Sequence, residues 1–269
     1  MTKFFGALTE LVALPDFRSE TWRTLRRQIS LASYHPLSEF LAMVIEPLFL
    51  LAVLSWGLGF WLKEVDGRSY PQYVVPGVAV LSCIFVPYWE VAFGVFSRIR
   101  QGHGYWVALQ GPISASDLGN GELLWACLKG AVAAMVVLIF GWLLGWVPSL
   151  LIFLAPIALL PGALLSAAFG LWCAVRLQSP SQLVLIQGLV LGPMALWSDT
   201  IFPFSLTSVA ADWLVFISPA GHLVHTLRML ASAEIRADFF LSLALLWGLA
   251  CIAANYAVFR FSRRLVPGG

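Results

Sequence analysis

Charged residues are scarce in this chain of 269 residues, since Asp, Glu, Lys and Arg together make up only 11% of it. Soluble domains typically carry about 25% charged residues. Hydrophobic residues make up 60% of the sequence, and the mean hydropathy is +0.85. This composition excludes an ordinary soluble domain and indicates an integral membrane protein.

Motifs for catalysis and nucleotide binding are also missing. The sequence has no HExxH zinc motif, no serine nucleophile elbow and no glycine-rich phosphate loop ending in Lys-Ser or Lys-Thr. We therefore expect no catalytic residues, no bound cofactor and no P-loop ATP site in this chain. His222 and His225 lie three residues apart, but no nearby Cys or carboxylate has the spacing of further metal ligands, so we expect no metal site.

Cysteine pairs with metal-binding or redox spacing are absent too. Each of the four cysteines lies inside an apolar run: Cys83, Cys127, Cys173 and Cys251. This placement favours small apolar core residues over disulfides. We also expect no cleavable signal peptide, because the first apolar cluster is short and is interrupted by Glu10.

The sequence is rich in long apolar stretches. A membrane-spanning helix needs ~20 mainly apolar residues. Six stretches meet this length: 40–61, 74–97, 122–146, 150–175, 182–200 and 237–260. Prolines inside the second and fourth stretches predict kinked helices in a bundle, because neighbouring helices must satisfy the backbone carbonyls that proline frees. The predicted fold is an all-α polytopic membrane protein, with one transmembrane domain at 40–269 after an N-terminal segment at 1–39.

The N-terminal segment contains a predicted amphipathic helix after Asp16. Trp22, Leu25, Ile29 and Leu31 fall roughly on one face, and arginines surround the other. A basic amphipathic helix of this kind lies along a membrane surface. Whether it also contacts a cytosolic partner stays open at this point.

Basic residues predict the orientation of the spans. With both termini inside, the inner segments hold Lys3, Arg18, Arg23, Arg26, Arg27, Arg98, Arg100, Arg176, Arg260, Arg263 and Arg264. The outer segments then hold only Lys63, Arg68, Arg228 and Arg236. Because Lys and Arg are enriched in cytoplasmic loops, both termini are predicted to be cytosolic.

The longest polar interruption, residues 98–122, joins the second and third spans and is therefore predicted to be a cytosolic elbow. Tyr105 to Leu109 predicts a short helix with an aromatic face, which Gly111-Pro112 ends. Ser116 or Asp117 is expected to cap the helix that follows. On the other side of the membrane, residues 201–236 hold two apolar clusters too short to span. We expect a pair of short helices there, dipping into the outer leaflet.

Three charged residues lie six or more residues inside the ends of predicted spans: Glu46, Glu90 and Lys129. At 1.5 Å per residue all three are ~9–12 Å inside the cytosolic boundary. An uncompensated charge at that depth costs about 3 kcal/mol or more. We hypothesise that they form one layer, with Lys129 paired to Glu46 or Glu90. The alternative is that Lys129 extends to the surface and the glutamates face a wet cavity.

Glycines four residues apart suggest close helix contacts in two spans. Gly141 and Gly145 have this spacing in the third span, and Gly188 and Gly192 have it in the fifth. The fifth span also carries Gln187 near the same face, which makes it the predicted surface for self-association.

Nearly the whole chain resembles the membrane subunits of ABC-2 type transporters, and most closely the lipo-oligosaccharide exporters of the nodulation-protein-J kind. Four stretches carry the resemblance in order: Glu46-Pro47-Leu48 in the first span, Tyr73-Val74-Val75-Pro76-Gly77 at the second, Trp106 to Leu109 with Pro112-Ile113-Ser114, Asp117-Leu118 and Gly121-Glu122-Leu123-Leu124-Trp125 around the elbow, and Ile217-Ser218-Pro219 with His222 and Leu227-Arg228 in the outer segment.

This resemblance implies a permease subunit in a bacterial inner membrane, working as a dimer with two copies of a cytosolic ATPase that uses ATP and Mg. The elbow helix would be the coupling helix that contacts the ATPase, and the outer helices would form a gate with Pro219, His222 and Arg228. The predicted ATPase-contacting residues are Gln101, His103, Tyr105, Trp106, Leu109 and Gln110. The implied cargo is an amphiphile moved outward from the inner leaflet, and no nucleic acid is expected as a partner.

Two other functions stay open. One is an intramembrane enzyme acting on a lipid through Glu46, Glu90 and His222, which the predicted topology disfavours because it puts the histidine near the opposite membrane face. The other is a relative of these transporters that anchors or assembles another protein. For an exporter, the cargo also stays open among a lipo-oligosaccharide, an undecaprenyl-linked glycan, another lipid and a hydrophobic drug.

Overall fold

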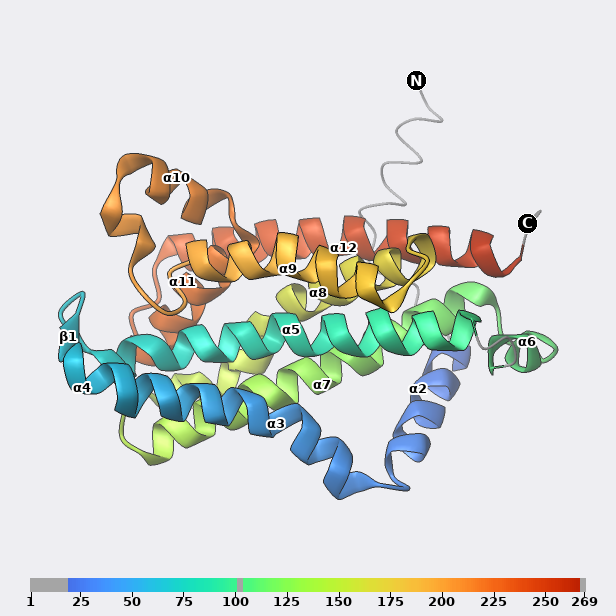
Figure 1. Ribbon diagram of the computed structural model, residues 1–269, viewed down its shortest axis with the longest axis horizontal. Helices are drawn as coiled ribbons and strands as arrows, with labels where there is room; N and C mark the ends of the chain where they lie inside the picture. Colours follow the sequence, from blue (N-terminus) through green and yellow to red (C-terminus); the bar gives the residue numbers. More distant parts are fainter. Residues whose placement is uncertain (1–18, 101–103, 267–269) are drawn as a thin grey trace.

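The computed structural model describes residues 19–100 and 104–266, and this part of the chain is almost entirely helical (Figure 1). Six helical runs are long and apolar enough to cross a membrane: Pro36–Trp61, Tyr70–Arg100, Ala115–Leu143, Leu150–Arg176, Pro180–Trp197 and Ala237–Leu265. Each covers most of one predicted span. The prediction of an all-α polytopic membrane protein is therefore confirmed.

The spans are built from the following elements. The first joins α3 (Pro36–Ala52), a π-helical turn η1 (Val53–Leu58) and α4 (Gly59–Trp61). The fourth joins a 3₁₀ turn η2 (Leu150–Leu154) to α8 (Ala155–Arg176). The others are single helices: α5 (Tyr70–Arg100), α7 (Ala115–Leu143), α9 (Pro180–Trp197) and α12 (Ala237–Leu265).

Short elements connect the spans. A two-stranded antiparallel hairpin, β1 (Glu64–Val65) and β2 (Arg68–Ser69), pairs Glu64 with Ser69. The remaining helices are α2 (Ser19–Ala32), α6 (Gly104–Leu109), η3 (Phe204–Thr207), α10 (Val209–Ile217) and α11 (Pro219–Ser232). The last two meet at 88°, as expected for the predicted pair of short outer helices.

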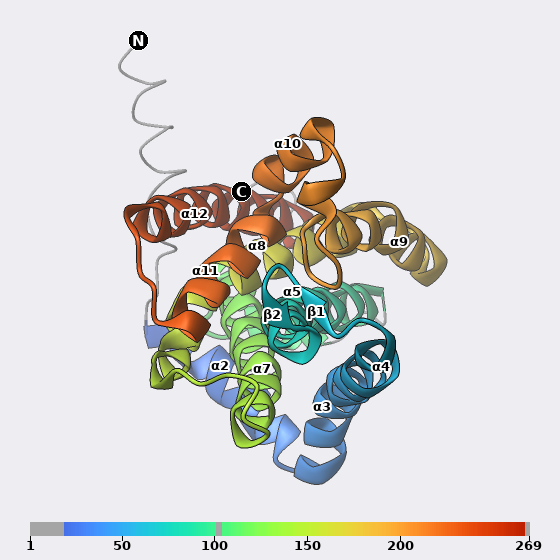
Figure 2. The same cartoon turned by 90° about the vertical axis from the view of Figure 1, so that its left-hand side faces the viewer.

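Helix α5 forms the centre of the bundle and is the most buried of the six spans. It packs against α7 and α8, which also pack against each other, while α3, α9 and α12 lie around this core (Figures 1 and 2). The least buried spans are α9 and α3, so these two helices leave most of their apolar surface for lipid or another protein to cover.

Prolines and glycines fit this packing in different ways. Pro156 lies inside the fourth span, as the sequence suggested, in the first turn of α8 just after η2. In the first turn of a helix a backbone N–H has no acceptor within the helix, so a proline there costs no helical hydrogen bond. A Cβ at Gly141 would lie 2.6 Å from Val75 Cγ1, so α7 and α5 are in close contact at this glycine. Gly145 instead follows the end of α7 with a φ of +72°, a conformation that glycine adopts easily.

The two ends of the bundle differ. Helices α2 and α6 lie at one end, while the hairpin, α4 and α10 lie at the other (Figure 1). The elbow helix and the outer helices are therefore separated by the length of the spans, as the sequence predicted. We refer to the end that carries α2 and α6 as the α6 end.

Candidate functional site

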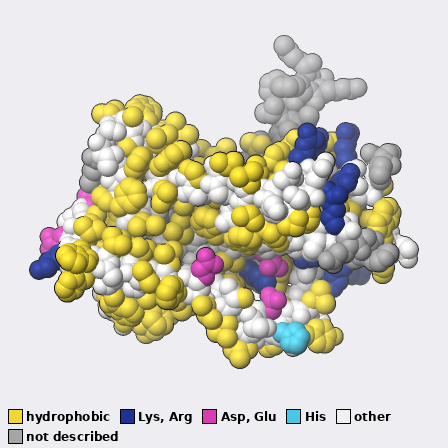
Figure 3. Space-filling model, in the orientation of Figure 1, with side chains coloured by type: hydrophobic (Ala, Val, Ile, Leu, Met, Phe, Trp, Pro, Cys, Tyr) yellow, Lys and Arg dark blue, Asp and Glu magenta, His cyan; other side chains and the backbone are white. Residues whose placement is uncertain are grey.

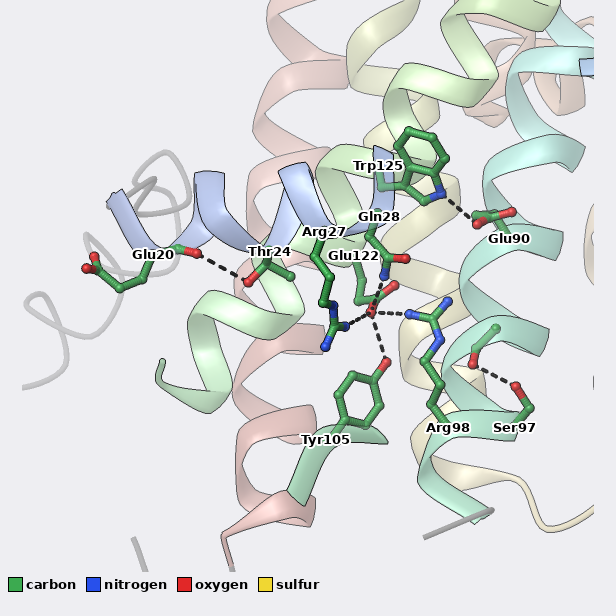
Figure 4. Close-up of polar contacts among 11 residues, drawn as sticks. Glu20, Thr24, Arg27, Gln28, Glu90, Ser97, Arg98, Tyr105, Glu122 and Trp125 are labelled. Carbon is green, nitrogen blue, oxygen red and sulfur yellow. Dashed lines mark hydrogen bonds and ion pairs between the residues drawn. The ribbon is translucent and has the colours of Figure 1, made fainter. Parts of the chain in front are cut away.

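At the α6 end, four helices meet at the carboxylate of Glu122 on α7. The Glu122 side chain is only 1% exposed. Arg98, from the last turns of α5, donates a hydrogen bond to its Oε1 and forms an ion pair with it. The Tyr105 hydroxyl of α6 donates to the same oxygen at 3.1 Å, and Gln28 Nε2 of α2 donates at 2.7 Å (Figure 4).

Arg27 completes this set of residues, which we call the Glu122 cluster. Its Nη2 lies 4.0 Å from Glu122 Oε1. A buried carboxylate is tolerated only when charges and hydrogen-bond donors compensate it, and here two guanidinium groups, a hydroxyl and an amide do so. Burial and then the nearby Glu122 carboxylate raise the pKa of Tyr105 well above its usual value, so the phenol stays protonated and keeps its hydrogen bond.

The start of α7 is fixed by local hydrogen bonds. Ser114 is the N-cap: Asp117 N donates to its Oγ at 3.1 Å, and Ser114 N donates to Asp117 Oδ2 at 3.2 Å. This is a capping box, which satisfies two otherwise unpaired backbone groups. The prediction that Ser116 or Asp117 would be the cap is therefore wrong, because Asp117 is the third residue of the helix and supports a cap that begins earlier.

Helix α2 docks on this first part of α7 through its polar face. Thr21 Oγ1 donates to Asp117 Oδ1 at 3.2 Å, and a Cβ at Gly121 would lie 2.5 Å from Thr24 Cγ2. The apolar residues Trp22 and Ile29 remain exposed. The amphipathic helix predicted from the sequence thus packs Thr21, Thr24, Gln28 and one predicted apolar-face residue, Leu25, on the protein, and leaves the rest of its apolar face free for a membrane surface.

A second group of charges lies about two turns further along α7. Lys129 Nζ donates to Glu90 Oε2 at 2.8 Å and to Glu39 Oε2 at 2.7 Å. Trp125 Nε1 donates to the other oxygen of Glu90 at 2.8 Å, and Lys129 lies 5.2 Å from the centre of the Trp125 ring. We call Lys129, Glu90, Glu39 and Trp125 the Lys129 cluster. The structure therefore has the expected pairing with Glu90, adds Glu39, and shows no ion pair for Glu46 within the described residues.

A cavity of about 590 Å³ opens beside the Lys129 cluster. Its polar lining includes Glu39, Glu46, Glu90, Lys129 and Gln187, and its apolar lining includes Met43, Leu50, Phe85, Trp89 and Phe93. Figure 3 shows acidic side chains gathered beside a basic one in the middle of this face, with hydrophobic side chains around them. Since α3, α5 and α9 contribute residues, the cavity lies beside the two least buried spans.

The short elbow helix α6 presents two large apolar side chains outward. Trp106 is 57% exposed and Val107 is 69% exposed. Tyr105 is buried in the Glu122 cluster, so the structure does not present it to a partner as the sequence-based contact set required. Leu109 is half-buried and Gln110 is exposed, while the predicted contacts Gln101 and His103 lie outside the described residues.

The predicted self-association residues lie on α9. No atom lies within 4 Å of a Cβ placed on Gly188, and Gly192 meets only the backbone of its own helix at 4.0 Å. This glycine pair is therefore open within the described chain. Gln187 faces the cavity, and its buried Oε1 has no hydrogen-bond partner within the part of the chain that the structure describes.

The predicted gate residues lie in or next to α11. Pro219 begins the helix, and His222 Nδ1 lies 3.1 Å from Ser242 Oγ. Arg228 lies over the ring of Tyr73 at 3.9 Å and donates a hydrogen bond to Asp199 O. The contacts of His222 include neither Glu46 nor Glu90, so the catalytic combination considered for an enzyme is not assembled.

Sequence reasoning missed Glu122 and Glu39 as site residues. Glu122 stands at the start of the predicted third span, where a carboxylate normally meets water. The arginines that flank the elbow, together with the polar residues of the N-terminal helix, were the available signal. Glu39 lies one residue before the predicted first span, and only the longer helix α3 shows that it reaches Lys129.

Six spans, with the amphipathic helix α2 and the elbow helix α6 at one end, define a multi-pass membrane protein. The family model of the ABC-2 type transporter matches residues 19–231, from α2 through most of α11. The chain therefore belongs to the ABC-2 type transporter family and is a transmembrane permease component of an ABC transporter.

Curated relatives agree with this family. The chain is 29% identical over 189 residues to nodulation protein J of Azorhizobium caulinodans, which covers 70% of this chain and 74% of the relative. It is 26% identical over 236 residues to nodulation protein J of Rhizobium meliloti, and this match covers 86% of this chain and 88% of the relative. The protein of the same name from Bradyrhizobium diazoefficiens is 26% identical over 244 residues, with 89% of each chain covered.

Proposed function

We propose that this permease exports a lipid-like or lipid-linked amphiphile, driven by ATP hydrolysis in a separate ATPase subunit. The observation that carries the proposal is the position of α6. It presents Trp106 and Val107 outward, while its Tyr105 is tied to a buried carboxylate that also holds α2, α5 and α7. A force applied to the exposed side would reach two spans directly.

In this proposal the chain itself binds no nucleotide or other cofactor, and ATP and Mg belong to two ATPase copies docked on the α6 end. The α6 end would face the cytosol, with both termini, in a bacterial inner membrane. The excess of Lys and Arg in the segments at this end supports that orientation. Movement of α6 would pass through the Glu122 cluster into α5 and α7.

The cavity beside the Lys129 cluster supports an amphiphilic cargo. Its aromatic and aliphatic lining suits an acyl chain, while Glu39, Glu46, Glu90 and Lys129 offer hydrogen-bonding groups to a polar head. Trp89 and Phe93 stack with their ring centres 4.4 Å apart and line the cavity together with these carboxylates. This combination suits a sugar head, which needs both polar and flat apolar contacts. Within this class we favour a lipo-oligosaccharide, because the motifs quoted above resemble those of lipo-oligosaccharide exporters.

Two further parts complete the proposed transport unit. The poorly buried helix α9, with Gln187, Gly188 and Gly192, would pair with a second copy of this chain. The bent pair α10 and α11 would act as the outer gate, with Pro219 at its hinge. His222 and Arg228 would hold the closed gate against Ser242 and Tyr73.

The proposal is tested by co-purification from cells that express the chain with the genes next to its own. We expect the tagged permease to retain a P-loop ATPase, whose hydrolysis rate rises when a lipo-oligosaccharide is added to the reconstituted complex. A partner whose P-loop lysine is replaced should still bind but should not hydrolyse ATP. If crosslinking before purification captures no P-loop protein, the proposed energy coupling is wrong.

The Lys129 cluster makes a separate prediction. Lys129→Glu would place three carboxylates together beside an apolar cavity, so we expect a large loss of transport and a lower melting temperature. The double variant Lys129→Glu/Glu90→Lys reverses the pair and should recover much of both. A double-mutant cycle on thermal unfolding should give a coupling energy of about 1–3 kcal/mol. Additive effects of the two substitutions would contradict a direct ion pair.

A further inference from the structure

A pocket surrounded by arginines lies at the α6 end, away from the two clusters described above. Its cavity of about 430 Å³ is lined by Arg100, Arg176, Arg260, Arg263 and Arg264, with Val175 and Gln178. The arginines come from the last turns of three helices: α5, α8 and α12. Figure 3 shows basic side chains gathered at this end of the molecule. We call this site the arginine pocket.

The arginine pocket has no carboxylate in its lining, and none of its five arginines forms an ion pair within residues 19–100 and 104–266. This differs from Arg23, Arg27 and Arg98 at the same end, which each have a glutamate partner. The C-termini of three helices supply roughly −1.5 charges in total against the +5 of the guanidinium groups. A strong positive potential therefore remains in the pocket.

Two of the guanidinium groups are held in place without being neutralised. Arg100 lies 5.5 Å from the centre of the Phe96 ring and donates a hydrogen bond to Leu177 O at 3.2 Å. Arg263 lies 4.5 Å from the centre of the Phe259 ring. Because these contacts already restrict the two side chains, less conformational entropy is lost when an anion binds. A planar guanidinium can also donate to two phosphate oxygens at once.

An exposed apolar stripe on α12 leads directly to the arginine pocket. Ile252, Tyr256 and Phe259 are all more than 40% exposed. Their spacing of four and three residues puts them on one face of the helix, and Arg263 follows one turn later on the same face. A ligand with a phosphate head and an acyl tail would match both features, whereas a soluble acidic protein would match only the charge.

We propose that the arginine pocket binds the phosphate head of an anionic membrane phospholipid, whose acyl chain lies along the α12 stripe. This site is distinct from the proposed cargo cavity and does not depend on which cargo is exported. Its position at the ends of three spans is the depth at which lipid phosphates lie. Basic pockets between helices at a membrane surface bind acidic lipid heads in this way.

The test is lipid binding to the purified full-length permease in detergent, measured by native mass spectrometry with added cardiolipin, phosphatidylglycerol or phosphatidylcholine. We expect the two anionic lipids to bind and phosphatidylcholine to bind far more weakly. Because each arginine near a lipid surface contributes about fivefold in affinity, Arg260→Gln/Arg263→Gln should weaken cardiolipin binding about 25-fold. The matched control Arg68→Gln/Arg236→Gln removes two arginines at the other end and should bind like the wild type.

Three results would overturn the proposal. The first is cardiolipin binding by the Arg260→Gln/Arg263→Gln variant that equals binding by the wild type. Stabilisation of the permease by inorganic phosphate as large as that by cardiolipin would mean a site for free phosphate. Loss of ATPase binding with unchanged lipid binding would mean an acidic protein partner. If the double glutamine variant fails to insert, the single variant Arg263→Gln replaces it. Its affinity for cardiolipin should fall about fivefold, and unchanged affinity there counts as the first of these three results.

Discussion

Replacing Glu122 by alanine is expected to lower the free energy of unfolding by about 3–5 kcal/mol and to abolish transport. The reason is that Arg98 would keep its partly buried charge without its ion-pair partner, and Tyr105 and Gln28 would lose their acceptor. The loss would reach four helices at once, since α2, α5, α6 and α7 all contact this carboxylate. Thermal unfolding of the purified permease in detergent measures the effect.

Controls separate the buried charge from a general effect of losing a carboxylate. Glu234 is exposed and lies 3.4 Å from Arg236, so Glu234→Ala should change stability by only about 0–1 kcal/mol. Arg98→Gln/Glu122→Gln removes both charges and should be more stable than Glu122→Ala, because no uncompensated charge from this pair is left inside. If Glu122→Ala unfolds at the same temperature as Glu234→Ala, the cluster does not hold the four helices together.

The spans could be predicted closely because a run of about 20 apolar residues is a local property. The depth of Glu90 and Lys129 also followed from the rise per residue along two helices, which is why their pairing was among the expected ones. The polar docking of α2 could not be predicted in the same way. It depends on contacts such as Gln28 with Glu122, which are 94 residues apart in the chain.

The orientation of α6 shows a different limit. A helix of six residues is too short for hydrophobic periodicity to decide which side is buried. Tyr105 and Trp106 are adjacent aromatics, and the sequence treats them alike. In the structure their environments differ. The Tyr105 side chain is buried and its hydroxyl donates to Glu122, whereas the apolar Trp106 ring lies outside that polar cluster and is exposed. Among the described residues of the elbow, we therefore expect Trp106 and Gln110, together with the exposed Val107, to contact the ATPase, and we no longer expect Tyr105 to do so.

Replacing Trp106 by alanine is expected to uncouple the transporter, with transport falling by at least tenfold while ATP hydrolysis continues. An exposed tryptophan at the centre of an interface commonly contributes 2 kcal/mol or more to binding, so the ATPase should dock on α6 about 30-fold more weakly. The permease itself should keep its stability, because Trp106 makes no part of the Glu122 cluster. Transport and ATPase rates of the reconstituted complex measure the two effects separately.

The matched control is Trp61→Ala, which removes an 82% exposed tryptophan at the opposite end of the bundle and should leave coupling unchanged. Tyr105→Phe gives the complementary case, since it removes only the hydroxyl that donates to Glu122. That variant should still dock the ATPase but transmit its movement less well, so transport falls while ATPase affinity stays the same. Normal transport by Trp106→Ala would mean that the ATPase docks elsewhere, and weaker docking by Tyr105→Phe would mean that this buried tyrosine belongs to the contact surface after all.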